Sequence, residues 1–123
     1  MQNQQHDIAQ GNNQESAELM DLIKKFTPRT IRHQKCEVLN LTKDLHVIVY
    51  EPRVCTCDYN ITMGNDQRIL TRGCIHFDNN ASNPETKAEI VLDTKIQGIK
   101  TAIKHLKTQM EFYESQLTNP EYV

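Results

Sequence analysis

The last third of the chain carries a regular apolar stripe. Apolar residues recur at alternating steps of four and three over more than three heptads: Leu92, Ile96, Ile99, Ile103, Leu106, Met110, Tyr113 and Leu117. This spacing predicts one long helix with a single buried seam. The helix is expected to begin near Asn83-Pro84, where proline suits the first helical position, and to end before Asn119-Pro120. Gly98 lies inside it and is expected to weaken it or to mark a kink.

The earlier apolar pattern predicts a short helix followed by strands. A helix is expected from about Glu15 to Phe26, because its apolar residues fall on one helical face before Thr27-Pro28 ends it. Four strands are expected after it: Thr30–Leu41, Leu45–Tyr50, Val54–Met63 and Gln67–Phe77, with a hairpin turn at Gly64-Asn65-Asp66. The predicted fold class is therefore α+β: a short N-terminal helix, a four-stranded antiparallel meander and a long C-terminal helix, with the helices on one face.

Length and composition predict one domain with short tails. The chain has 123 residues, of which 37% are apolar, and its formal net charge is −2. Residues 15–119 are expected to form a single domain, and residues 120–123 a short tail. Eight of the first fourteen residues are Asn or Gln, so residues 1–14 are expected to form a disordered tail.

The same sequence predicts a protein that stays out of the membrane. No apolar run approaches the roughly 18 residues of a spanning helix, and the N-terminus has neither the basic nor the apolar segment of a signal peptide. We therefore expect reduced cysteines and a cytoplasmic or nuclear location. Three glycosylation sequons, at Asn40, Asn60 and Asn80, are the argument for secretion, which is the weaker expectation.

The long helix also predicts a partner. At 1.5 Å per residue it spans about 50 Å, whereas four strands span about 20 Å, so roughly 20 Å of a straight helix overhangs. We expect a non-enzymatic protein–protein interaction or assembly subunit whose partner is another protein or a second copy, bound through Ile99, Ile103, Leu106, Met110, Tyr113 and Leu117. A parallel pairing would oppose Lys95 to Lys100, so an antiparallel or heteromeric pairing is favoured. The alternative is a helix that bends at Gly98 and packs entirely on its own domain.

Two local basic stretches, residues 24–35 and 95–107, are the basis of an alternative function. Basic side chains occur in them with no intervening acid: Lys24, Lys25, Arg29, Arg32, Lys35, Lys100, Lys104 and Lys107. Such stretches suit the phosphate backbone of a nucleic acid. No aromatic residue interleaves them, so stacking on unpaired bases is not expected, and most charged stretches are simply solvated.

A metal site is a further hypothesis. Cys55, Cys57, Cys74 and His76 would share one face of a hairpin if Cys57 paired with Cys74, and would then form a Cys₃His zinc set. A register that pairs Met63 with Gln67 unites the apolar faces instead and separates the two halves of the set. A bulge at Gly73 would restore the first arrangement. Buried free thiols are the default expectation.

An enzymatic function has the least support in the sequence. No catalytic motif or phosphate-binding loop is present, and the five histidines show no pairing with a nucleophile that the sequence can place. His46 opens an apolar strand, which is typical of a hydrogen-bonded sheet residue. We therefore expect neither catalysis nor a bound cofactor.

Overall fold

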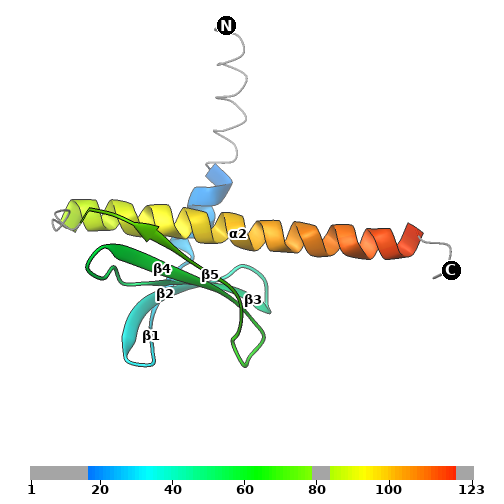
Figure 1. Ribbon diagram of the computed structural model, residues 1–123, viewed down its shortest axis with the longest axis horizontal. Helices are drawn as coiled ribbons and strands as arrows, with labels where there is room; N and C mark the ends of the chain where they lie inside the picture. The colour runs from blue at the N-terminus through cyan, green and yellow to red at the C-terminus, as the bar shows by residue number, and fades with distance from the viewer. Residues whose placement is uncertain (1–16, 79–83, 119–123) are drawn as a thin grey trace, which may run out of the picture.

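The protein has a five-stranded antiparallel sheet with a long helix across one face (Figure 1). The computed structural model describes residues 17–78 and 84–118; the predicted tails and the predicted start of the long helix at residue 83 lie outside them. A short N-terminal helix covers residues 17–24. The remaining elements are β1 (Thr27–Ile31), β2 (Gln34–Asn40), β3 (Leu45–Tyr50), β4 (Thr56–Met63), β5 (Arg68–His76) and α2 (Pro84–Thr118). The α+β class is confirmed, and the strands follow one another as a meander.

The expectation of four strands was wrong, because the segment predicted as one strand from Thr30 to Leu41 folds into two. A two-residue turn at Arg32 and His33 joins β1 to β2, with Ile31 paired to Gln34. Both turn residues have positive φ, 52° and 68°. Tight hairpin turns of this kind usually carry Asn and Gly, which tolerate positive φ. Arg and His give no such signal, so the turn was not visible in the sequence.

The β4–β5 hairpin begins in the predicted register that would pair Cys57 with Cys74, and a bulge then takes it out of that register. Its turn spans residues 64–67, and Met63 pairs with Arg68. The bulge shifts the pairing between Ile61 and Thr62, so that Leu70 is the extra residue of β5. Beyond the bulge, Cys57 lies opposite Ile75. The bulge is therefore at Leu70, and it has the opposite effect from the one considered at Gly73.

The core lies between α2 and the sheet face that the helix covers. Val47 and Ile61 are fully buried there, and Leu39 and Leu45 almost so. The N-terminal helix adds Leu19, Leu22 and Ile23 to the same cluster. The continuous β-branched run of β3 therefore occupies the centre of the sheet, as expected for a buried central strand. Two layers, sheet and helices, make up the fold.

Gly98 does not kink α2, which continues unbroken from Pro84 to Thr118. Its role is close packing, because a Cβ at this position would lie 2.8 Å from Cγ1 of Val47. Gly73 has a similar role in β5, where a Cβ would lie 2.3 Å from the ring of Tyr59. That ring crosses β5, and its hydroxyl lies 3.3 Å from Oγ1 of Thr101 on α2. The two glycines therefore allow the helix and the sheet to approach closely.

Candidate functional site

The face of α2 that packs on the sheet has a row of small residues at its centre. The buried residues of α2 are Ile90, Thr94, Gly98, Ile99 and Ala102. Thr94, Gly98 and Ala102 are spaced four apart and therefore lie in one row. Short side chains in this row let the helix axis lie near the strands. The helix is anchored further by Lys95, whose Nζ lies 2.9 Å from Oε1 of Glu37 and 5.1 Å from the centroid of the Phe26 ring.

The heptad-like stripe is not this buried face. At 3.6 residues per turn, the mean direction of the stripe is rotated by roughly 100° around the helix from the direction of Gly98. Ile99 is the one stripe residue that the structure buries fully, and Leu92, Ile96 and Leu106 are half-buried. The alternative of a helix that bends at Gly98 and packs entirely on its own domain is therefore wrong. The stripe lies along the side of α2, next to the buried face, and continues along the helix beyond the edge of the sheet.

The second half of α2 extends beyond the sheet (Figure 1). Ala102 is the last fully buried residue of the helix, so the free end of α2, residues 103–118, has a length of about 24 Å at 1.5 Å per residue. On it, Met110 is 61% exposed, Tyr113 63% and Leu117 78%. These three stripe residues project from a part of the helix that its own domain does not cover. The free end is therefore an apolar surface with no partner within the described chain.

Phe112 is a further exposed apolar residue of the free end, and at 3.6 residues per turn it lies on the side of Thr94 and not on the stripe. Its side chain is 57% exposed, and its ring packs edge-on against that of Tyr113 with centroids 5.6 Å apart. The free end therefore carries exposed apolar side chains on more than one side of the helix. The signal that could have identified Phe112 was its size, because a large aromatic residue is costly to leave exposed on a solvated helix.

Charges on the free end follow an unusual order. Lys104 and Lys107 come first, Glu111 and Glu114 come later, and the last turn has no basic residue. Acidic side chains near a helix C-terminus are unfavourable, because the backbone carbonyls there carry partial negative charge. The local order of charges therefore costs the isolated helix stability.

The basic residues considered for nucleic-acid binding lie on separate surfaces. Lys100, Lys104 and Lys107 are exposed on α2. Arg29 and Arg32 line hollows on the opposite face of the sheet. The other members are exposed on the N-terminal helix end and on β2: Lys24, Lys25 and Lys35. Arg29 and Arg32 are therefore separated by the sheet from the three lysines of α2.

The four residues considered for zinc do not come together. Cys57 is fully buried on the helix side of the sheet, and Cys55 is exposed in the turn before β4. Cys74 and His76 share the other face, with Sγ 3.5 Å from Nε2. In the part of the chain that the structure describes, no three His, Cys, Asp or Glu side chains form a metal-binding group. The register across β4 and β5 is the reason for this separation.

Burial governs the chemistry of the two internal thiols. Burial raises the pKa of the Cys57 thiol above 9.0, although the nearby Thr94 hydroxyl lowers it in part. The thiol donates to the carbonyl oxygen of Tyr50 at 3.4 Å. Burial likewise raises the pKa of Cys36. Both side chains are therefore protonated at neutral pH and behave as small apolar core residues.

Comparisons with protein-family models, curated proteins and solved structures give no significant match to this chain. None of its described helices has the length and apolar character needed to span a membrane. The function has to be inferred from the geometry of the molecule itself, and the free end of α2 is its most prominent unexplained surface.

Proposed function

We propose that this chain is an assembly subunit, and that two copies associate by antiparallel pairing of the free ends of α2. The observation that carries the proposal is the exposure of Met110, Tyr113 and Leu117 on a helix that extends past its own sheet. Side chains of this size each contribute roughly 1.5–3 kcal/mol when they become buried. Association itself costs about 4–15 kcal/mol, and the six such side chains of a symmetric pair, at about 9–18 kcal/mol together, are of the size needed to offset it.

An antiparallel register matches both the apolar residues and the charges. When Leu106 lies beside Leu117 of the second copy, Met110 lies beside Tyr113 of that copy. The same alignment brings Lys107 next to Glu114 of the second copy. Because a two-fold axis relates the copies, each of these contacts occurs twice. The order of lysines before glutamates is unfavourable within one helix, and in this pairing it becomes complementary.

A parallel pairing has less support. It would place Lys95 against Lys100 of the other copy, and Lys95 is already engaged by Glu37 and Phe26. It would also bring both sheets to the same end of the pair. In the antiparallel arrangement the sheets lie at opposite ends, because each sheet covers residues before Ile103.

The first experiment measures molar mass by light scattering over a concentration series. The wild-type protein is expected to approach twice the monomer mass, and Met110→Asp with Leu117→Asp is expected to remain monomeric. Leu106 is left unchanged because it packs against the core. The matched control, Thr108→Asp with Ser115→Asp, adds the same charge at exposed positions off the stripe and should still dimerise. A wild-type protein that stays monomeric at every concentration would show the proposal to be wrong.

A charge reversal tests the direction of the pairing. Lys107→Glu should weaken the dimer, because it places two glutamates together at each end of the seam. Adding Glu114→Lys to this variant should restore dimerisation, since the pair is then exchanged rather than lost. In a parallel pair these two positions do not face each other, so the second change would restore nothing.

A further inference from the structure

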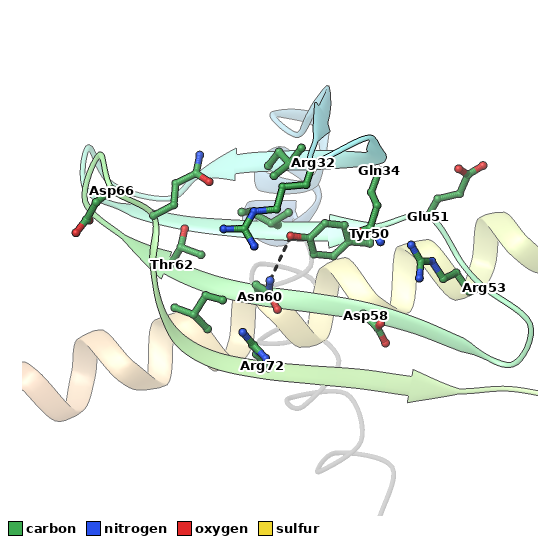
Figure 2. Close-up of a pocket in the computed structure, with 14 residues that line it drawn as sticks. Arg32, Gln34, Tyr50, Glu51, Arg53, Asp58, Asn60, Thr62, Asp66 and Arg72 are labelled. Carbon is green, nitrogen blue, oxygen red and sulfur yellow. Dashed lines mark hydrogen bonds between the residues drawn. The ribbon is translucent and has the colours of Figure 1, made fainter.

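A polar groove crosses the sheet face that α2 leaves uncovered. The β1–β2 turn and β5 both line it, although four strand spacings would separate them by about 19 Å in a flat sheet. The sheet therefore curves around the groove, which has a volume of about 340 Å³. This volume is within the usual range for a small-molecule site, about 300–1,000 Å³. Figure 2 shows the side chains that line it.

The floor of the groove holds a hydroxyl that has no partner. Thr62 is 2% exposed, and its Oγ1 makes no hydrogen bond among the described residues. A buried hydroxyl normally has a partner, because an unsatisfied one costs free energy. Beside it, Nδ2 of Asn60 donates to the Tyr50 hydroxyl at 3.2 Å. That hydroxyl therefore keeps its own proton for another acceptor, and two O–H donors lie in one hollow.

Arg32 reaches over this floor from a strained turn. Its side chain extends from the β1–β2 turn above the groove, on the side of Tyr50 and Thr62 (Figure 2). Arg32 and His33 adopt φ of 52° and 68°, a conformation that costs free energy in residues other than Gly and Asn. Strain of this kind persists at functional sites where the exact placement of a side chain matters. Here the strained turn places a guanidinium over the two hydroxyl groups.

The charged side chains of the groove are ordered along its length, with two arginines at the middle and acids toward the ends. Arg32 and Arg72 face each other across its middle, from the turn and from β5 (Figure 2). Asp66 lies at one end, and Glu51 and Asp58 lie toward the other together with Arg53. Within the described residues, the ion pair of Lys95 with Glu37 is the one formed between side chains, so neither Arg32 nor Arg72 is neutralised by a neighbouring acid. The middle of the groove is therefore electropositive and rich in donors.

We propose that this groove binds the oxyanion of a small molecule, a phosphate or a carboxylate, between Arg32 and Arg72. The guanidinium groups supply charge-assisted hydrogen bonds, and the hydroxyl groups of Tyr50 and Thr62 donate from below. Oγ1 of Thr62 is shielded in the free protein, so its hydroxyl donates to the anion only after the side chains around it shift. This site is independent of the free end of α2.

Amide NMR titration tests the proposal with two probes, inorganic phosphate and acetate, at an ionic strength held constant with sodium chloride. At least one probe should produce saturable shifts at Tyr50, Asn60 and Thr62, and the stronger one identifies the source of the oxyanion. Replacement of chloride alone should produce none. The absence of saturable shifts with either probe at millimolar concentrations would overturn the proposal, as would shifts spread evenly over exposed lysines.

Three variants assign the binding to the groove. Arg32→Gln should weaken binding about tenfold or more, because it removes a charge-assisted contact. Its matched control is Arg68→Gln, the same charge change at the start of β5 outside the groove, which should bind as the wild type does. Thr62→Val keeps the shape of a buried strand residue and should fold, yet bind more weakly. Equal weakening by Arg32→Gln and Arg68→Gln would mean an adventitious ion only and would reject the site.

Discussion

Replacing Gly98 by Ala has two opposite effects on the free energy of unfolding: a gain in helix propensity and a loss in core packing. Alanine is favoured over glycine inside a helix by about 1 kcal/mol. At this position, however, the new Cβ would lie 2.8 Å from Cγ1 of Val47, whereas carbon atoms in contact prefer about 3.5–4.0 Å. Val47 is fully buried and β-branched, so its side chain has little room to move.

The packing effect should win. Forcing an extra methyl group into a close-packed core costs about 1–3 kcal/mol, and the helix gains about 1 kcal/mol. The expected result is a net loss of about 1 kcal/mol in the free energy of unfolding. Urea denaturation followed by circular dichroism measures it, and an unchanged m-value would show that the unfolded states are comparable.

Two controls separate the terms. Gln97 is the exposed neighbour of Gly98 on α2, so the difference between Gln97→Gly and Gln97→Ala measures helix propensity without packing. Val47→Ala should cost about 2 kcal/mol alone, but less in the Gly98→Ala background, because the new methyl group occupies the space that valine vacates. If Gly98→Ala instead raises stability by the full propensity difference, α2 does not pack this closely on β3.

Three further predictions concern the sheet. Replacing Arg32 by Asn together with His33 by Gly should raise the free energy of unfolding by about 1–2 kcal/mol in urea denaturation, because both residues tolerate positive φ; an unchanged or lower value would mean that the turn is not strained. Gly73→Ala should lower it by about 3 kcal/mol, since its Cβ would lie 2.3 Å from the Tyr59 ring, and a neutral effect would place the ring elsewhere. Because the folded-state pKa of Cys57 is raised above 9.0, the thiol ionises first in the unfolded chain, and stability should fall as pH rises past about 9. Between pH 7 and pH 10, the free energy of unfolding should fall less in Cys57→Ala than in the wild-type protein. An equal fall in both proteins would exclude this thiol as the cause.

The elements with strong local patterns were predictable. The β-branched run in β3 was identified with its observed bounds, Leu45 and Tyr50, and α2 ends at Thr118, directly before Asn119-Pro120. These predictions succeeded because period, proline position and β-branching act within a few residues of chain. The turn at Arg32 and His33 was not predicted, because it has no such local signal. Neither Arg nor His is typical of a turn position with positive φ.

Of the two candidate sites, one was visible in the sequence and the other was not. The apolar stripe of α2 was visible as a sequence pattern, and the structure locates its exposed part at Met110, Tyr113 and Leu117. The groove was not visible, because Arg32, Thr62 and Arg72 come from three separate segments and meet only when the sheet curves. The separation of Cys57 from Cys74 likewise depended on a one-residue bulge, which reverses the faces of a strand.

The sequence by itself determined the α+β class, the central strand and the extent of the long helix, because each follows from short-range periodicity. Only the tertiary structure decided which face of α2 the sheet covers. The row of Thr94, Gly98 and Ala102 outcompeted the more apolar stripe, since small side chains allow a closer approach to β3 and β4 and therefore more complete packing. As a result the stripe runs along the flank of α2, and Met110, Tyr113 and Leu117 stand exposed beyond the sheet.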